Sequence, residues 1–354
     1  MKRITSMLLV LSLVAIVFVG CAGKDSNVTE PIKENEEVET SENEPLVDDT
    51  VYKLRTSTNL GEVGTTGLAL KYFVDQVNER SGGRIEATAN YGSELGSQLE
   101  QVEMAQLGDL EMVCAAPGTG LGGWVPELAM YEFPFIFDDN EQYRKVLVDT
   151  EDEVTKLVSE YGFTAASGQS QGARNILTLK PINTIEDLAG VKMRGPNVVY
   201  TDMFDALGAA GTITGWNDIY TSLQTKVIEG CEASPSALYS MNFHEQAKNM
   251  TVTNHIIACT YYFFNTEWLE SLPDNLKTIV LESAEDAREY HAKLYDEEDA
   301  IALQAMIDEG VNVIELSPEE KAKFVEACSG MLDEYRAKGD NWNAFIDVLL
   351  AAKN

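Results

Sequence analysis

The segment from Leu188 to Ser234 constrains the fold of this chain most strongly, because its pattern predicts a strand, a loop, a helix, a loop, a helix and a strand. Val191–Met193 is the first short strand, and Arg194 leaves it immediately before Gly195-Pro196, which cannot continue a strand. A guanidinium group at a strand end that faces a cleft suits an organic anion, since its donors can bind a carboxylate in bidentate fashion. Taken alone, however, a single arginine is more often a surface residue.

Further residues of this segment make the pattern more specific. They are, in order, Val191-Lys192-Met193-Arg194-Gly195-Pro196-Asn197, then Trp216, then Tyr220, Leu223, Gln224, Glu229, Gly230 and Glu232. This pattern resembles the substrate-binding proteins of TRAP (tripartite ATP-independent periplasmic) transporters, the DctP-like family. In that family a strand ending in L-K-x-R-x-P-x is followed by a helix, an aromatic residue and Y-x-x-L-Q-x-x-x-x-(D/E)-G-x-E. The resemblance extends over essentially the whole chain from Tyr52 to the C-terminal region.

The resemblance implies an α/β fold with a two-lobe, periplasmic-binding-protein-like (Venus-flytrap) architecture and a long helix spanning both lobes. The chain length agrees, since 354 residues exceed what one hydrophobic core usually serves. The expected parts are a lipoprotein signal peptide at 1–20, a disordered acidic tether at 21–50, lobe I at 51–171 and 259–300, and lobe II at 172–258 and 301–354.

The N-terminus has the pattern of an export signal. Met1-Lys2-Arg3 precedes an apolar run, Met7–Val19, that is too short for a comfortable stable membrane anchor. Phe18–Cys21 resembles the bacterial lipobox, in which the cysteine receives diacylglycerol, although Phe18 stands where leucine is usual. Lipid on Cys21 would tether the protein to the outer face of the cytoplasmic membrane. The alternative is a plain secretory signal with an incidental cysteine.

Acidic residues dominate both the expected tether and the body. Residues 22–50 contain ten acids against two lysines and few aliphatic residues, which predicts a disordered, self-repelling linker. The formal net charge of the chain is −32. Because such a surface repels phosphate backbones, a nucleic-acid partner is not expected.

Strands and helices are expected to alternate in the folded body. Periodicity predicts strands at 51–56, 84–91 and 110–115, with helices at 68–81 and from 97 between them. This alternation within about sixty residues argues for a parallel sheet. A second α/β unit is expected to begin near Gly172, a strand at 258–265 to return to lobe I, and residues 311–316 with the helices after Ser317 to complete lobe II.

The longest expected helix runs from Asp274 to Glu309, which contains no Pro or Gly and precedes Gly310, a suitable C-terminal cap. It would reach roughly 50 Å, enough to span two lobes. By contrast, the aromatic segment Pro126–Phe137 is expected to pack as a buried structural loop and not to bind a ligand.

Arg194 and Arg174 are the principal candidate ligand-binding residues. In the resembled family, the arginine matching Arg194 grips the ligand carboxylate. The arginine matching Arg174 belongs to a G-x-R motif, here Gly172-Ala173-Arg174, and serves as a partner or a second anchor. Without the resemblance, both would more simply be solvated or salt-bridged arginines of an acidic protein.

Three further residues are expected at the ligand. Asn59 matches an asparagine of the first lobe that reaches the ligand in some members of the family. Trp216 matches an aromatic position beside it and would stack on an apolar or sugar face, although a core position between helix and sheet is an open alternative. Asn197 follows the arginine motif and could donate to the ligand.

The chain departs from the family at one position. Many members carry G-Q-E-N-P, whose asparagine touches the ligand, but here Ala233 follows Glu232 and cannot make that hydrogen bond. Ser234 or Ser236 is expected to compensate, and the ligand identities tied to that asparagine do not carry over.

The sequence lacks the common signatures of metal sites and catalysis. It has no C-x-x-C, H-E-x-x-H or P-loop, so neither a metal, a cofactor nor enzymatic activity is expected. Cysteines other than Cys21 are scattered and are expected to be buried free thiols, namely Cys114, Cys231, Cys259 and Cys328.

The resemblance therefore implies an extracytoplasmic, lipid-anchored solute-binding protein. Its lobes would close on a small organic carboxylate, such as a sugar acid, a dicarboxylate or a 2-oxo acid, and deliver it to the membrane subunits of a TRAP permease. An alternative is a ligand-sensing lipoprotein that presents a bound organic acid to a signalling receptor. An extracellular enzyme is a more distant third possibility.

Overall fold

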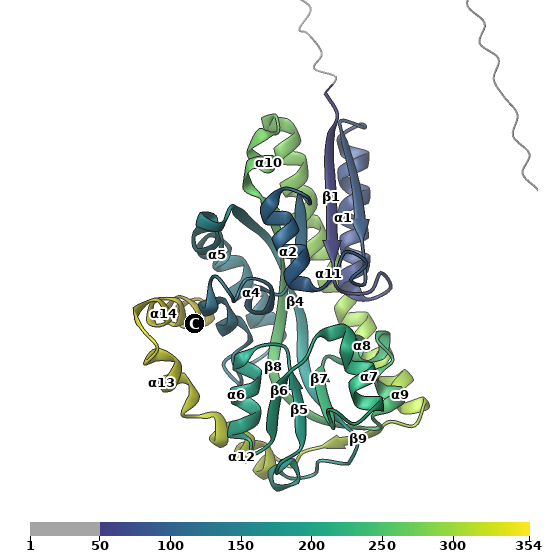
Figure 1. The fold of residues 1–354 in the computed structure, drawn as a ribbon, viewed down its shortest axis with the longest axis vertical. Coiled ribbons are helices and arrows are strands. Elements are labelled where there is room, and N and C mark those ends of the chain that lie inside the picture. The colour runs from purple at the N-terminus through teal and green to yellow at the C-terminus, as the bar shows by residue number, and fades with distance from the viewer. Residues whose placement is uncertain (1–49) are drawn as a thin grey trace, which may run out of the picture. The chain divides into compact units, whose positions relative to one another are not determined.

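The computed structural model describes residues 50–354, so the expected signal peptide, the lipidation site at Cys21 and nearly all of the expected tether lie outside the described residues. The described part contains a mixed sheet of nine strands in the order β2-β1-β3-β8-β4-β7-β5-β6, with β9 paired to β8. Helices pack around this sheet (Figure 1), which confirms the expected α/β class.

The first lobe is a parallel β-α-β-α-β unit. It comprises β1 (Tyr52–Thr58), α1 (Thr65–Arg80), β2 (Ile85–Asn90), α2 (Gln98–Leu107) and β3 (Met112–Ala115). The apolar face of α1 buries Leu70, Phe73 and Val77 in the core of this lobe. Phe73 packs on the rings of Tyr262 and Phe264, with ring centroids 5.1 and 6.1 Å away. The helical periodicity read from the sequence therefore marks the buried face correctly.

Helix α1 begins at Thr65, three residues before the position expected from its glycine-rich approach. Gly67 lies inside the first turn, where a Cβ atom would stand 2.2 Å from the carbonyl oxygen of Gly61. The glycine thus lets the helix press against its preceding loop, whereas the helix expected at 68–81 left Gly67 outside it.

The second lobe is built around the segment that constrained the sequence analysis. It comprises β5 (Lys192–Gly195), α6 (Val198–Ala206), β6 (Ala210–Ile213), η4 (Trp216–Asp218), α7 (Ile219–Gln224), β7 (Gly230–Ala233), α8 (Pro235–Ser240) and α9 (Phe243–Gln246). Two expectations need correction. Arg194 lies within β5, opposite Thr212 of β6, and not beyond the strand end. Strand β6 was not expected, because its four residues, A-G-T-I, include a glycine and form an exposed edge.

Two long antiparallel strands connect the lobes. They are β4 (Phe163–Thr178) and β8 (Asn249–Asn265), which pair along most of their lengths with several register shifts. β3 of the first lobe pairs with the C-terminal end of β8. β7 of the second lobe pairs with the C-terminal end of β4, which lies at the other end of this antiparallel pair. The expected strand at 258–265 is therefore only the second half of a longer strand, and Gly172 lies in the middle of β4. The proposed lobe boundaries near 171 and 258 fall inside these two strands.

The long helix is confirmed as α11 (Asp274–Asp308), which runs behind the sheet from one lobe to the other (Figure 1). At its middle it meets α1 through a stacked pair of rings, Tyr72 on Tyr290, with centroids 4.5 Å apart. Near its end, the Asp299 carboxylate accepts a hydrogen bond of 3.0 Å from the backbone amide of Ser236 on α8. It ends before Gly310, whose φ of 86° is the left-handed geometry expected of a cap.

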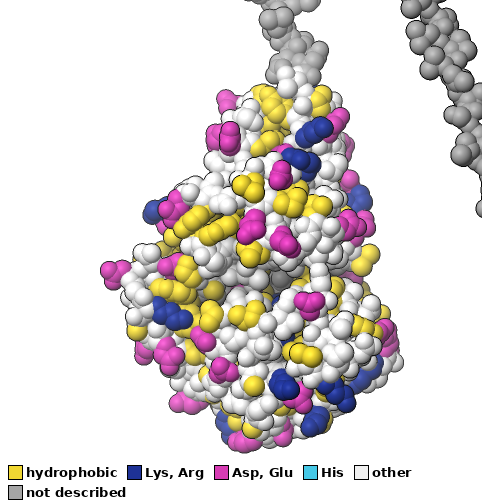
Figure 2. Space-filling view, viewed as in Figure 1, with side chains coloured by type: hydrophobic (Ala, Val, Ile, Leu, Met, Phe, Trp, Pro, Cys, Tyr) yellow, Lys and Arg dark blue, Asp and Glu magenta, His cyan; other side chains and the backbone are white. Residues whose placement is uncertain are grey.

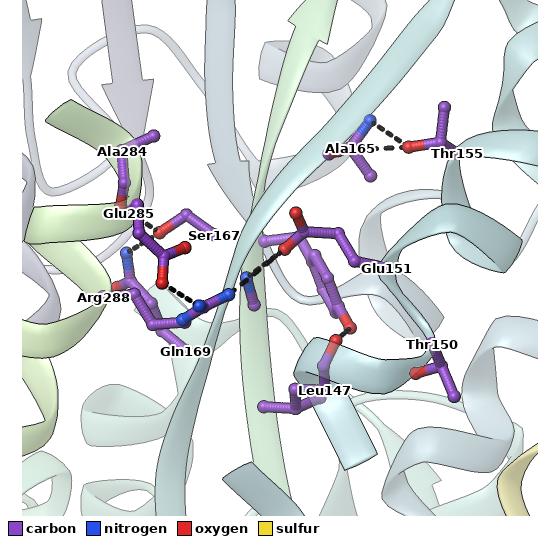
Figure 3. Close-up of polar contacts among 12 residues, drawn as sticks. Leu147, Thr150, Glu151, Thr155, Ala165, Ser167, Gln169, Ala284, Glu285 and Arg288 are labelled. Carbon is purple, nitrogen blue, oxygen red and sulfur yellow. Dashed lines mark hydrogen bonds and ion pairs between the residues drawn. The ribbon is translucent and has the colours of Figure 1, made fainter. Parts of the chain in front are cut away.

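Polar contacts hold α11 to the irregular part of β4 (Figure 3). The hydroxyl of Ser167, at a φ of 57°, donates to the carbonyl of Ala284 on α11 at 2.7 Å. Arg288 pairs with Glu285 on its own helix and lies 3.6 Å from Glu151, at the start of α5 (Glu151–Val158). Glu151 also accepts a hydrogen bond of 3.2 Å from the Gly168 amide. These contacts fix the helix at the crossing between the lobes.

The C-terminal elements return along the second lobe and then reach the first. They are β9 (Asn312–Glu315), α12 (Pro318–Cys328), α13 (Met331–Arg336) and α14 (Asp340–Lys353). Helix α12 packs on α6, but α14 packs on α4 (Asn140–Asp149) and on the 3₁₀ helix η1 (Pro126–Glu132). Because 126–149 belongs to the range assigned to lobe I, these contacts favour moving α14 out of lobe II.

Short elements fill the remaining connections, namely α3 (Pro117–Gly120), η2 (Ser159–Tyr161), η3 (Ile185–Leu188) and α10 (Thr266–Ser271). Within residues 50–354, none of the helices combines the length and apolar character needed to span a bilayer. The cysteines of the described part, Cys114, Cys231, Cys259 and Cys328, are buried free thiols, as expected.

Candidate functional site

A cavity of about 470 Å³ lies between the two lobes, where the surface is hollowed in the middle of the face shown in Figure 2. Six of its lining residues stand just beyond the carboxyl ends of parallel strands, namely Asn59, Ser93, Ala116, Pro196, Thr214 and Ser234. In open α/β sheets this edge is where ligands bind, because the connecting loops diverge there. The volume of the cavity is typical of a small-molecule binding site.

Arg194 projects into this cavity from β5 and is only 3% exposed. Its Nε donates to the carbonyl oxygen of Thr214 at 2.9 Å, and its guanidinium carbon lies 5.5 Å from the centre of the Trp216 ring. Its buried Nη1 has no hydrogen-bond partner within the described residues and lies 3.7 Å from the nearest oxygen of Glu232. Although buried donors are normally satisfied, this nitrogen keeps a hydrogen-bond donor available at the cavity wall.

Arg174, from β4, also lines the cavity, but two of its three side-chain nitrogens are already engaged. Its Nη2 donates to Glu232 Oε1 and to the Glu232 carbonyl, each at 2.9 Å, and its Nε donates to Oε2. This buried bidentate pair matches the salt-bridged alternative of the sequence analysis. Arg174 therefore contributes its charge to the cavity wall and holds Glu232 in place.

Glu232 sits at the centre of this charged group, and the sequence analysis quoted it only as part of a motif. Burial opposes its ionisation, but the charge and hydrogen bonds of Arg174 outweigh burial and lower the pKa of Glu232. His255, on β8, has its Nε2 3.7 Å from Glu232, and burial lowers the pKa of that imidazole. Glu232 is thus a fixed carboxylate that orients both arginines.

Trp216, Asn59 and Ser234 all line the cavity, as expected. The Trp216 ring also packs edge-on against Phe243, with centroids 5.1 Å apart. A position at the cavity and a packing role in the core are therefore compatible for this residue. Its indole Nε1 lacks a hydrogen-bond partner within the described residues. The Ser234 hydroxyl lies 3.3 Å from that of Ser236, which lines the cavity as well. Both serines therefore place a hydroxyl group at the cavity wall.

Asn197 is not among the residues that line the cavity. It caps α6, since its Oδ1 accepts from the Val199 amide at 3.0 Å. Its Nδ2 donates to Glu132 Oε2 at 3.0 Å. The structure thus gives Asn197 a supporting position behind the wall, because both ends of its amide are used within the protein.

Glu132 is a cavity residue that the sequence analysis missed, because it belongs to the aromatic segment expected only to pack. Most of that segment is indeed buried in the core, but the Glu132 carboxyl faces the cavity and is 2% exposed. It accepts hydrogen bonds from Tyr200 at 3.1 Å and from Asn197. Burial raises the pKa of Glu132 to about 7. The sequence signal that could have identified Glu132 as a site residue was an acidic residue among aromatic neighbours.

The first-lobe wall is mostly neutral. The N-caps of α1 and α2, Gly64 and Ser97, both line the cavity, so the positive ends of two helices lie at this wall. Uncharged hydrogen-bonding side chains surround them, namely Asn59, Thr65, Thr66, Gln98, Thr119 and Gln171. The cavity thus opposes a wall that carries two guanidinium groups to one that can bind hydroxyl groups. Among residues 50–354 there is no cluster of metal-ligating side chains.

Comparison with known proteins gives a consistent result. Residues 56–338 match the family described as "Bacterial extracellular solute-binding protein, family 7" (DctP). The chain is 30% identical over 279 residues to a solute-binding protein of Sulfitobacter sp. NAS-14.1, covering 76% of this chain and 82% of the relative. It is 28% identical over 271 residues to the C4-dicarboxylate-binding periplasmic protein DctP of Rhodobacter capsulatus, covering 74% and 80%.

Solved structures of TRAP periplasmic solute-binding proteins are similar over most of the described body. One from Pseudomonas putida F1 with bound D-glucuronate has a TM-score of 0.77 and 26% identity, covering 83% of this chain and 96% of the other. One from Sulfitobacter sp. NAS-14.1 with bound β-D-galacturonate has a TM-score of 0.79 and 26% identity, covering 84% and 99%.

Proposed function

Because the chain belongs to the bacterial extracellular solute-binding protein family 7, the DctP family of TRAP substrate-binding proteins, we propose that it captures a sugar acid of the hexuronate type. The lobes close on this ligand, and the loaded protein delivers it to the membrane subunits of a TRAP permease. Binding and release leave the ligand chemically unchanged, so the protein is not an enzyme.

The observation that carries this proposal is the buried Nη1 of Arg194, which makes no hydrogen bond within the described residues. A buried guanidinium with a free donor in a cavity of about 470 Å³ supports a desolvated carboxylate as its partner. Thr214 accepts from Nε of that guanidinium and its Nη1 lies 3.7 Å from Glu232, so little side-chain freedom is lost on binding. Arg174 acts mainly by positioning Glu232.

The charge of the cavity favours one carboxylate over two. Arg194 and Arg174 are the lysine or arginine residues that line it, and Nε and Nη2 of Arg174 are already bonded to Glu232. A second carboxylate of a C4-dicarboxylate would therefore meet a guanidinium that is already paired with Glu232. The polar first-lobe wall and the Trp216 ring suit the hydroxyl groups and the flat face of a sugar. The uronates bound by two similar structures support this choice.

Calorimetric titration tests the ligand class directly. The purified protein is titrated with D-galacturonate, D-glucuronate, succinate and pyruvate, and with D-galactose as the matched sugar without a carboxylate. We expect at least one uronate to bind most tightly, succinate to bind more weakly and galactose to give no heat. Tightest binding of succinate or pyruvate would replace the hexuronate with that acid, and binding of galactose would remove the carboxylate from the proposal.

The cellular setting is also part of the proposal. Lipid on Cys21 would hold the protein on the extracytoplasmic face of the membrane, with residues 22–50 as a linker to the body. The membership in an extracellular solute-binding family supports this location. None of the relatives described above favours a signalling receptor as the partner, so the sensor alternative is not proposed.

A further inference from the structure

Glu132 is a buried acid on the cavity wall without a cation of its own. Within residues 50–354, no lysine, arginine or histidine makes an ion pair with it, whereas the neighbouring Glu232 pairs with both arginines. Its two oxygens accept hydrogen bonds from neutral groups, the Tyr200 hydroxyl and the Asn197 amide. The wall thus holds two carboxyls and two guanidinium groups in a small volume.

The contacts of Glu132 tolerate either protonation state. Had its partner been a lysine or an arginine, only the carboxylate would fit, because those groups donate without accepting. A tyrosine hydroxyl accepts as readily as it donates, so Tyr200 can stay bonded to Oε1 when that oxygen carries a proton. The carboxyl can therefore change its charge without a rearrangement of its surroundings.

Charged and titratable groups face Glu132 from several elements. They are Arg174 on β4, Glu232 on β7, Tyr200 on α6, Tyr143 on α4 and Cys259 on β8. Burial raises the pKa of Glu132 to about 7, the nearby Glu232 adds to this, and Arg174 with the two hydrogen bonds opposes it. Because burial holds the pKa values of Tyr143, Tyr200 and Cys259 well above their usual ranges, these three stay neutral near pH 7.

We propose that Glu132 takes up a proton from solvent when the anionic ligand enters the cavity, and so tunes the affinity of the site to pH. With Glu132 ionised, the charges of the two arginines and the two glutamates cancel. With Glu132 protonated, these four groups carry one net positive charge to match the ligand carboxylate. This inference rests on the proposed function, since it requires that the ligand be an anion.

The direction of the effect follows from linkage. The ligand's negative charge disfavours the ionised form of Glu132 and raises its pKa, so the complex binds more protons than the free protein. Affinity is therefore highest and constant at low pH, where Glu132 is protonated in both states. It falls as pH rises above the pKa of the free protein, by about tenfold for each unit of pKa shift.

Calorimetry with D-galacturonate measures both consequences. At pH 7.5, titrations in phosphate and in Tris differ in apparent enthalpy if a buffer proton is taken up, and we expect uptake of a substantial fraction of one proton. Between pH 6 and pH 9 the Kd of the wild type should rise about tenfold or more. Glu132→Gln, which is nearly isosteric, should show no proton uptake, and its Kd should change by less than twofold between pH 6 and pH 9. Glu127→Gln, also buried on η1 but outside the cavity lining, should behave as the wild type.

A second variant protects the test against a Glu132→Gln protein that fails to fold. Tyr200→Phe keeps the ring but removes the hydroxyl that stabilises the ionised carboxylate, so the midpoint of the Kd profile should move to higher pH. An unchanged midpoint, or wild-type binding without proton uptake and with a constant Kd, would overturn this inference alone. If no acid of the test series binds at any pH, the proposed function is overturned together with it.

Discussion

Arg194 is the residue at which ligand binding can be separated from folding. Removing one partner of a buried, charge-assisted contact typically costs on the order of 2–5 kcal/mol, so Arg194→Ala should weaken uronate binding by roughly 30-fold to several thousand-fold. Arg194→Lys should recover part of this, since an ammonium keeps the charge but loses the paired hydrogen bonds. Calorimetry on variants with native-like melting curves measures both effects.

Arg80→Ala is the matched control for that prediction. Arg80 lies in the first lobe, pairs with Asp286 and does not line the cavity, so its removal should leave the Kd within about twofold. An Arg194→Ala protein that is folded and binds like this control would remove Arg194 from the proposed site. The carboxylate contact would then pass to Arg174.

At the same scale, the sequence identifies residues that a motif carries and misses those that depend on distant partners. Arg194 could be named because its strand, its glycine and its proline are contiguous. The ion pair between Arg174 and Glu232 depends on the pairing of β4 with β7. The local sequence around either residue does not indicate this contact. Glu132 was missed for the same reason, since its donors come from α6.

At the scale of elements, the crossing of α11 over β4 depends on Gly172. This glycine has a φ of 71°, and a Cβ atom there would lie 1.7 Å from the Tyr295 hydroxyl of α11. Gly172→Ala should therefore destabilise the protein by roughly 2–5 kcal/mol, from backbone strain and overpacking together. Denaturant unfolding, read as a shift in the midpoint, measures this loss.

Gly123→Ala is the corresponding control. Gly123 is exposed and no heavy atom would lie within 4 Å of an added Cβ, so the free energy of unfolding should change by less than about 0.5 kcal/mol. Equal stability of the two variants would show that α11 does not press on β4 at this point.

Elements with strong periodicity were predictable, whereas weakly patterned strands were not. Strands β1 to β3 and helix α11 agree with the sequence analysis to within a few residues, because each has a continuous pattern between clear stops. Strand β6 lacks such a pattern, and the first half of β8 alternates too little to separate it from a loop. Tertiary pairing decides these cases, and it is invisible in a local window.

At the scale of the whole molecule, the proposed function requires movement of the lobes. Because the cavity lies between them, capture of the ligand should bring them together. Small-angle scattering should show a smaller radius of gyration when a saturating uronate is added to the purified protein. Tight binding without any compaction would contradict the closing clamp.

The proposed membrane attachment concerns the molecule as a whole as well. Cys21→Ser removes the thiol that would receive lipid, so the variant should be released from the membrane or retained as a precursor. Fractionation of cells followed by immunoblotting distinguishes these outcomes from normal attachment. A variant that stays in the membrane fraction at its mature size would refute the lipoprotein assignment.

The continuous passage of β4, β8 and α11 through both lobes has a consequence for cooperativity. These crossings lie within regular secondary structure and leave no flexible linker along which one lobe could detach. Melting either lobe would break the ladder between β4 and β8 that the other lobe also needs. The described body should thus lose its structure as one unit, and the amides of the two long strands should exchange with solvent only when that unit opens as a whole.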